Sequence, residues 1–314
     1  MSIPPDRARG AFLGLALGDA WGQPLEFMGG ASVRSQPVSL APGVFRWTDD
    51  THMALYLAQA VLDLAPGPLD EEAFGAAVGA QWVRWLHDPL TPCTAPGNAC
   101  LRGVRRFEAS GDWRTSGDPR NDGCGAVMRI APLALAFEGT ELTRAAMIQA
   151  QLTHAHPNAV EAAVAACHLL RWSLEQGRFH AELVLRAVTQ LRGTWARGGV
   201  VAEALLAAID FTARPDQRWL DEPSIPTGDG GWRSASALGL AVAAALYWGS
   251  DFATAVDRAA RIDGDSDSVA CLAGMFLGAA GGVGVLPVPW LQALPQRDHI
   301  DDLSQRLLAW RAQR

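Results

Sequence analysis

Lysine is absent from this sequence, and all 26 basic residues among its 314 are arginine. A chain without lysine cannot form a Schiff base with a carbonyl substrate, attach pyridoxal phosphate or supply the lysine of a P-loop. Positive charge is also in deficit, because the formal net charge at pH 7 is -7. This acidic balance argues against nucleic-acid binding, which depends on a basic surface.

Cysteine is scarce and shows no pairing pattern. The five cysteines are odd in number and none belongs to a CxxC motif: Cys93, Cys100, Cys124, Cys167 and Cys271. A zinc ribbon or a disulfide framework needs paired cysteines, so we expect reduced thiols and a cytoplasmic protein. The apolar run near the N-terminus is short and ends at Asp19, so no signal peptide is expected.

One uncharged run, residues 268–295, has the length of a membrane span. Gly281, Gly282 and the prolines that follow are typical of a helix end, and they interrupt the run after its first half. The pattern therefore predicts a buried core helix, and we expect no membrane association.

Alternating strand patterns are nearly absent, whereas alanine and leucine recur at helical spacing along the whole chain. We expect helices over 7–20, 51–64, 70–87, 98–109, 125–137, 141–152, 157–176, 180–193, 198–213, 233–249, 251–262, 268–280 and 298–312. No connector has the composition of a disordered linker, so the prediction is one all-α domain over residues 1–314. Gly10, Gly14 and Gly18 lie four residues apart, which favours close approach of another helix at that face.

Two acidic segments stand out against this apolar background. Asp263, Asp265 and Asp267 alternate just before the run at 268, and the segment 48–51, Thr-Asp-Asp-Thr, precedes another apolar helix. Acidic and hydroxyl residues commonly cap a helix and complement its dipole, and for either segment alone that interpretation is the simpler one. However, each segment offers more oxygens than a cap needs, and buried carboxylates require a partner.

Divalent cations would supply the missing charge. Mg²⁺ and Mn²⁺ prefer carboxylate, hydroxyl and water oxygens, and no histidine or cysteine is placed to make a zinc site. Asp49, Asp50, Asp265 and Asp267 carry four negative charges, which two divalent ions would balance. An EF-hand is excluded because Ser268 stands where its loop needs glycine, and Gly274 where it needs glutamate.

Five segments together resemble the ADP-ribosylglycohydrolase family: ARGAFLGLALGDAWGQPLEF, WTDDT, GCGAVMRIAPLAL, THAHPNAVEAA and GDSDSVACLAGMFLGAAGG. The matches occur in the family's order over nearly the whole chain. The resemblance implies a compact domain of orthogonally packed helices with two Mg²⁺ or Mn²⁺ ions in a central cleft. It also implies hydrolysis of the glycosidic bond between ADP-ribose and an acceptor.

The resemblance implies the following metal ligands: Thr48, Asp49, Asp50, Asp265, Asp267 and Ser268. It assigns catalytic roles to Glu26, Asp49 and Asp267. From its Gly/Pro-flanked turn alone, Glu26 would equally suit an ordinary surface position. Asp263 stands where the family usually has glycine, and the sequence leaves open whether it faces the metals.

The same resemblance implies substrate contacts from Gly123, Cys124 and Gly125, in a turn suited to phosphate. His154 matches a family histidine near the phosphates, and a helix-start histidine without a ligand is the alternative. Trp232 is a candidate for stacking on adenine, although a structural tryptophan would fit as well. Met128 and Arg129 are interpreted as packing residues, with Arg129 in a buried ion pair.

The expected substrate is an ADP-ribosylated protein or a small ADP-ribosyl conjugate, with an arginine linkage slightly favoured over serine or O-acetyl linkages by analogy. Two other functions stay open: an ADP-ribose-binding protein without turnover, and a metal-dependent phosphohydrolase acting on a nucleotide diphosphate. We expect a monomer.

Overall fold

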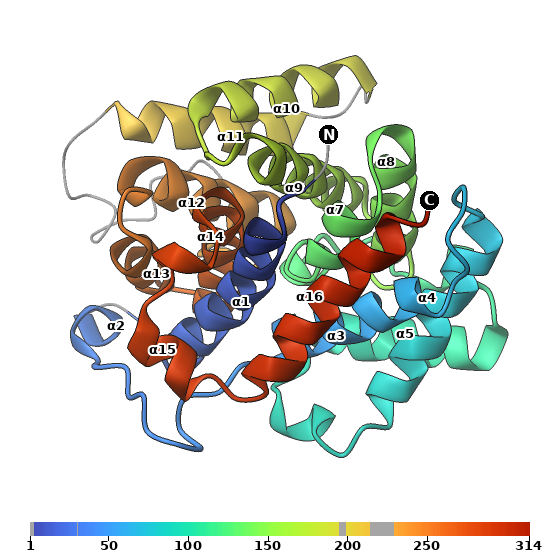
Figure 1. Ribbon diagram of the computed structural model, residues 1–314, viewed down its shortest axis with the longest axis horizontal. Helices are drawn as coiled ribbons and strands as arrows, with labels where there is room; N and C mark the ends of the chain where they lie inside the picture. Colours follow the sequence, from blue (N-terminus) through green and yellow to red (C-terminus); the bar gives the residue numbers. More distant parts are fainter. Residues whose placement is uncertain (1–2, 30, 195–198, 214–228) are drawn as a thin grey trace.

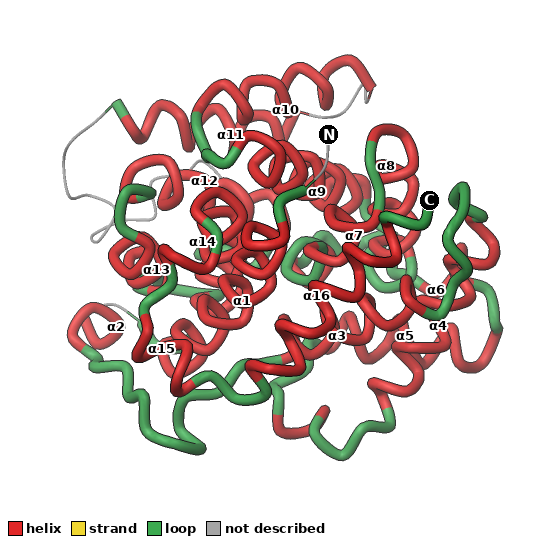
Figure 2. The backbone as a smooth tube through the Cα atoms, viewed as in Figure 1, coloured by secondary structure: helices red, strands yellow, loops and turns green. Residues whose placement is uncertain are grey.

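The computed structural model describes residues 3–29, 31–194, 199–213 and 229–314, and within them every regular element is a helix (Figures 1 and 2). The α-helices, in chain order, are α1 (Pro5–Gly22), α2 (Ala31–Ser35), α3 (Asp49–Leu62), α4 (Glu71–Leu86), α5 (Asn98–Ser110), α6 (Trp113–Ser116), α7 (Ala131–Ala136), α8 (Gly139–Gln151), α9 (Pro157–Gln176), α10 (Ala181–Thr194), α11 (Gly199–Thr212), α12 (Ser234–Trp248), α13 (Phe252–Ala260), α14 (Ser266–Gly281), α15 (Val288–Ala293) and α16 (Arg297–Arg311). Short 3-10 turns are η1 (Gln23–Leu25), η2 (Thr91–Cys93), η3 (Cys124–Ala126) and η5 (Val283–Val285). The all-α prediction is therefore confirmed.

The packing of α1 against α14 organises the domain (Figure 1). A methyl group added to Gly14 would lie 2.9 Å from the carbonyl carbon of Gly274, and one added to Gly22 would lie 2.5 Å from the Cα of Asp267. The two helices run antiparallel, because the start of α1 meets the end of α14. The predicted close approach at the α1 glycines is confirmed, and it joins the two ends of the sequence.

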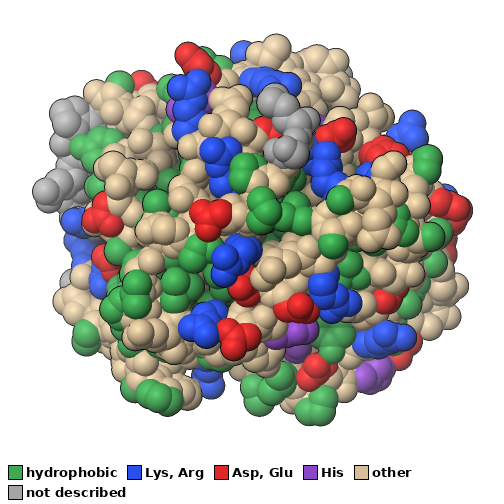
Figure 3. All heavy atoms as spheres, viewed as in Figure 1, with side chains coloured by type: hydrophobic (Ala, Val, Ile, Leu, Met, Phe, Trp, Pro, Cys, Tyr) green, Lys and Arg blue, Asp and Glu red, His purple; other side chains and the backbone are tan. Residues whose placement is uncertain are grey.

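The apolar run at 268 forms α14, whose side chains are nearly all buried. The helix ends at Gly281, and Gly282 follows with a φ of +72°, a conformation that favours glycine. Among the residues that the structure describes, no helix is both long enough and apolar enough to cross a membrane. Arginine and acidic side chains are interspersed over the face seen in Figure 3, with no broad basic patch on it.

The single helix expected over 125–137 is wrong. Its first part is the 3-10 turn η3, and α7 begins only at Ala131. Pro132 lies at the start of α7, where its missing N–H costs no hydrogen bond, whereas inside a longer helix it would break one. The short helices α2, α6 and α15 were also not predicted, because each is too short to show a periodic pattern.

Candidate active site

Two helix N-termini bring the acidic segments into one cavity. Asp49 and Asp50 begin α3, while Asp265 caps α14 and Asp267 lies in its first turn. All four are buried, and they line a cavity of about 390 Å³ together with Glu26. Carboxylates at these positions complement the positive ends of both helix dipoles, which explains locally why acidic residues occur there.

The carboxylate oxygens lie within reach of a shared cation. One oxygen from each of Glu26, Asp265 and Asp267 falls within 4.8 Å of the others. Through Oδ1, Asp50 accepts a hydrogen bond at 3.3 Å from the hydroxyl of Ser268, which is next to Asp267 in the sequence. The Oδ2 atom of Asp50 is buried and has no hydrogen-bond partner within the described ranges. A buried carboxylate oxygen without a partner is costly, and a metal ion in the cavity would give it one.

The pKa values of the cavity carboxylates also favour a bound cation. Burial, with Asp267 as the strongest neighbouring charge, raises the pKa of Glu26 to about 10. Burial raises the pKa of Asp49 to about 8, and it holds the pKa of Asp50 and Asp265 well above the ordinary value. These carboxylates therefore need protons or cations as partners, and hard oxygen donors of this kind fit Mg²⁺ or Mn²⁺.

Asp19, which ends the apolar run near the N-terminus, is a fully buried carboxylate. Its oxygens accept hydrogen bonds from the backbone N–H groups of Thr48 and Thr51 at 2.8 and 2.9 Å, and from their hydroxyls at 2.9 and 2.6 Å. Burial, followed by repulsion from Asp267, raises its pKa to about 7. Asp19 thus fixes the backbone that presents Asp49 and Asp50. The sequence feature that could have identified this role is a single aspartate inside an otherwise apolar helix.

The remaining predicted ligands take different places. Ser268 lines the cavity. Thr48 is almost wholly buried, and its hydroxyl donates to Asp19 and accepts the N–H of Asp50. Its role as a metal ligand stays a prediction. Asp263 is exposed and is not among the residues that line the cavity.

The glycine-rich turn forms another wall of the same cavity. Gly123 donates its N–H to Asn121 Oδ1 at 2.9 Å, and Cys124 donates its N–H to the carbonyl of Trp232 at 3.1 Å. These two N–H groups already have partners, as do those of Val127 and Met128, so the N–H of Gly125 is the better candidate for a phosphate. The thiol of Cys124 lies 2.7 Å from Asp265 Oδ2, a contact that the sequence did not reveal.

His154 lies beside this turn. A methyl group on Gly125 would lie 2.7 Å from His154 Cε1, so the close approach requires glycine there. The ring is almost fully buried, and its Nδ1 lies 2.8 Å from the hydroxyl of Thr153. Burial, followed by the nearby charge of Arg129, lowers the pKa of His154 to about 3. His154 is therefore neutral at physiological pH.

Arg129 corrects one expectation. Its guanidinium is fully buried, yet within the described ranges its hydrogen-bond partners are amide, hydroxyl and sulfur atoms rather than the carboxylate of an ion pair. It also lies over the ring of Trp82, 3.9 Å from the centroid. The Thr153 hydroxyl lies between the two side chains: it accepts a hydrogen bond from Arg129 at 2.7 Å and contacts Nδ1 of His154 at 2.8 Å.

Two aromatic residues complete the lining. Trp232 stacks on Phe27, with ring centroids 5.3 Å apart and an interplanar angle of 27°. The side chains are 41% and 76% exposed, respectively, so the pair lies at the mouth of the cavity. Phe27 was not predicted as a site residue, because only folding brings its ring against a residue 205 positions away in the sequence (232 − 27).

Comparison with known protein families gives a match over almost the whole chain. The sequence model of the ADP-ribosylglycohydrolase family matches residues 2–314. This chain belongs to the ADP-ribosylglycohydrolase family. Membership makes it a hydrolase of a glycosidic bond to ADP-ribose.

Two curated relatives of this ADP-ribosylglycohydrolase are particularly informative. The ADP-ribosylarginine hydrolase Tri1 of Pseudomonas putida (strain GB-1) is 32% identical, over 96% of this chain and 78% of the relative. The ADP-ribosyl-[dinitrogen reductase] glycohydrolase of Rhodospirillum rubrum is 31% identical, over 93% of this chain and 91% of the relative. A solved structure described as an ADP-ribosylglycohydrolase-related protein complex superimposes with a TM-score of 0.71 at 28% identity, covering 98% of both chains.

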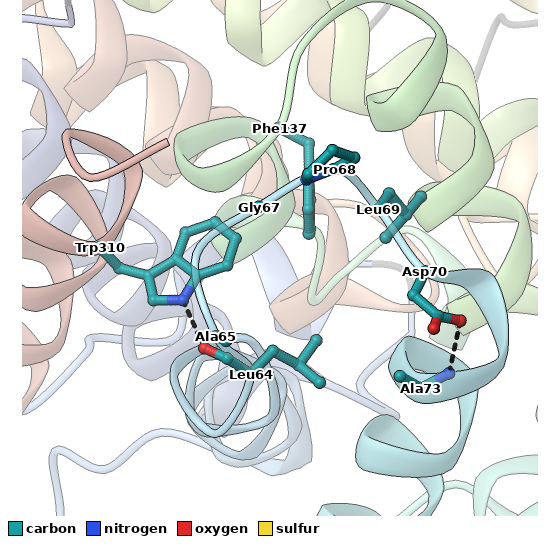
Figure 4. Close-up of a pocket in the computed structure, with 9 residues that line it drawn as sticks. All are labelled: Leu64, Ala65, Gly67, Pro68, Leu69, Asp70, Ala73, Phe137 and Trp310. Atoms are coloured by element: carbon teal, nitrogen blue, oxygen red, sulfur yellow. Dashed lines mark hydrogen bonds between the residues drawn. The ribbon is translucent and has the colours of Figure 1, made fainter.

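A smaller cavity of about 180 Å³ lies elsewhere in the glycohydrolase, between Trp310, Phe137 and the loop before α4 (Figure 4). The indole N–H of Trp310 donates to the Leu64 carbonyl at 2.7 Å, and Asp70 caps α4 by accepting from Ala73. The one carboxylate in the lining of this smaller cavity, that of Asp70, therefore already has a structural partner. The acidic cavity remains the candidate active site.

Proposed function

We propose that this protein is a metal-dependent hydrolase that releases ADP-ribose from ADP-ribosylated arginine side chains. The observation that carries the proposal is the acidic cavity, with five carboxylates in its lining and an unpartnered buried oxygen on Asp50. Support for the acceptor comes from the Pseudomonas putida relative, whose name specifies ADP-ribosylarginine.

We further propose two Mg²⁺ or Mn²⁺ ions, held by the ligand set predicted from the sequence: Thr48, Asp49, Asp50, Asp265, Asp267 and Ser268. When bound, such ions neutralise the cluster, orient sugar hydroxyls and acidify a water. The separation of the acids fits this role, because Glu26, Asp265 and Asp267 converge within 4.8 Å. The depth of burial also fits, since unpaired carboxylates would otherwise have to take up protons.

The protein's own groups would divide the chemistry as follows. With cations bound among the neighbouring carboxylates, Glu26 would be ionised and would take a proton from the attacking water, whose oxygen bonds to the anomeric carbon of the ribose. The bond from that carbon to the guanidino nitrogen breaks, and the leaving nitrogen takes up the proton that Glu26 received from the water. Asp49 and Asp267 would hold the reacting sugar in register from the N-termini of α3 and α14.

The substrate wall would bind the nucleotide. Neutral His154 can donate or accept a hydrogen bond there without adding charge, and the turn at Gly123, Cys124 and Gly125 lies next to it. Trp232 offers a face for adenine. We propose a cytoplasmic monomer acting on an ADP-ribosylated protein or a small conjugate, with no nucleic-acid partner. The five free thiols among the described residues suit a reducing compartment.

Product analysis tests the proposal. We expect incubation with arginine-ADP-ribosylated protein to release intact ADP-ribose, identified by chromatography. Release of AMP would instead show hydrolysis at the diphosphate and favour a phosphohydrolase. Tight ADP-ribose binding without any product from arginine, serine or O-acetyl conjugates would favour a binding protein.

A further inference from the structure

Phe27 combines two unfavourable features at the mouth of the cavity. Its φ of +63° lies in the left-handed region that bulky residues avoid, and its side chain is 76% exposed. Two backbone hydrogen bonds hold the turn, from Glu26 N to the Gly22 carbonyl at 3.2 Å and from Met28 N to the Leu25 carbonyl at 3.1 Å. Strain of this kind persists where the surroundings impose it, and it commonly marks a functional position.

The ring of Phe27 is held in place from the other end of the chain. It stacks on Trp232, whose carbonyl accepts the N–H of Cys124 at 3.1 Å. The neighbouring residues Gly123 and Arg233 form an isolated antiparallel bridge, which ties the same two segments together. Phe27 therefore presents a braced aromatic surface to the cavity mouth.

The charge around this surface is negative. Five carboxylates line the cavity, and among the described lining residues there is no arginine, although the chain has 26. Two divalent ions would bring four positive charges against these five negative ones. A group docking at the mouth would therefore be favoured if it carried a positive charge and had a flat face for an aromatic ring.

We propose that Phe27 binds the guanidinium of the acceptor arginine, with Trp232 bracing the ring. This inference rests on the proposed function and names the residue that gives it acceptor specificity. Phe27 directly follows Glu26, whose carboxylate converges with Asp265 and Asp267. The bond to be cleaved must lie near those carboxylates, so the leaving group lies within reach of the next side chain.

The test separates the acceptor from the nucleotide. Phe27→Gly removes the ring while suiting the positive φ, and Phe27→Tyr restores an aromatic ring as the matched control. The measurements are KM and kcat for arginine-linked and O-acetyl-linked ADP-ribose, together with the Kd of free ADP-ribose by calorimetry. Trp232→Ala is measured in parallel, because its proposed contact is with adenine.

We expect Phe27→Gly to raise KM for the arginine-linked substrate about 5–30-fold, as for loss of a cation–π contact. The kcat for that substrate, the KM for the O-acetyl substrate and the Kd for ADP-ribose should change less than about twofold. Phe27→Tyr should restore the KM. Trp232→Ala should weaken ADP-ribose binding.

Two results would overturn the inference: an unchanged arginine KM in Phe27→Gly, or a parallel loss of ADP-ribose affinity, which would place the ring against the nucleotide. If the unaltered protein cleaves no conjugate, the proposed function fails separately. The same variants are then compared by their Kd for the uncleaved arginine conjugate, where equal values would also overturn the role of Phe27.

Discussion

Gly14→Ala perturbs the contact on which the candidate site is built. The new methyl group would lie 2.9 Å from the carbonyl carbon of Gly274 and 3.4 Å from the Cα of Gly278. Ordinary van der Waals contact needs about 3.4–4 Å. Because the neighbouring atoms are backbone, no side chain can rotate away, and α1 and α14 must separate by roughly 1 Å.

The expected loss in the free energy of unfolding of Gly14→Ala follows from this overlap. Overpacking a core costs typically about 1–3 kcal/mol, and a clash with backbone lies at the upper end. For a chain of this size, a loss of about 3 kcal/mol lowers Tm by roughly 5 °C. The separation also moves Asp267, at the start of α14, relative to Asp50 on α3. A misplacement of about 1 Å at a reacting centre can reduce the rate about 100-fold.

The chain offers a matched control for the same chemical change. Gly193 lies in α10, and a methyl group built there meets no atom within 4 Å. Gly193→Ala should therefore raise the free energy of unfolding by up to about 1 kcal/mol, because alanine favours the helix. Thermal unfolding and urea titration compare the two variants. A Gly14→Ala protein as stable as Gly193→Ala would refute the account of the α1–α14 contact.

Three further predictions concern the acidic cluster. Asp267→Asn should abolish both activity and the Mn²⁺ binding that calorimetry measures. Asp263→Asn, at an exposed carboxylate outside the cavity, is the control and should bind Mn²⁺ as before. Retained Mn²⁺ binding in Asp267→Asn would contradict the ligand assignment. Asp19→Ala should lower the free energy of unfolding by at least about 3 kcal/mol in urea, because four buried donors lose their acceptor; a cost below about 1 kcal/mol would contradict its structural role. In EDTA, Tm should fall between about pH 4 and 8, since raised pKa values, about 8 for Asp49 and about 7 for Asp19, make the folded state bind more protons than the unfolded state. Each extra proton bound by the folded state lowers the free energy of unfolding by about 1.4 kcal/mol per pH unit as the pH rises. Mn²⁺ should reduce this dependence. A Tm that rises with pH in EDTA would contradict the prediction.

Helical periodicity predicted most of the fold because it is a local property. The first helix was expected over 7–20 and lies at Pro5–Gly22, and the helix expected over 157–176 lies at Pro157–Gln176. The spacing of the α1 glycines predicted a close contact but not its partner, since the matching glycines of α14 are more than 250 residues away. The break before Ala131 was missed because apolar spacing continues through Pro132.

The site was predictable where its functional residues are close together in the sequence. Asp265 and Asp267 before an apolar run indicated a site, and folding places them in one cavity with Asp49 and Asp50. The role of Asp19 in fixing the backbone before α3 was not predicted, because the hydrogen-bond donors that it accepts from belong to another segment of the chain. The same reason applies to Phe27, whose exposure and stacking are tertiary properties.

Metal-dependent release of ADP-ribose is the decisive measurement for the proposed function. The protein is stripped with EDTA, mixed with arginine-ADP-ribosylated protein, and assayed by chromatography before and after Mg²⁺ or Mn²⁺ is restored. We expect no product in EDTA and intact ADP-ribose when either ion is added back. Equal release of ADP-ribose in EDTA and in the restored sample would contradict this expectation.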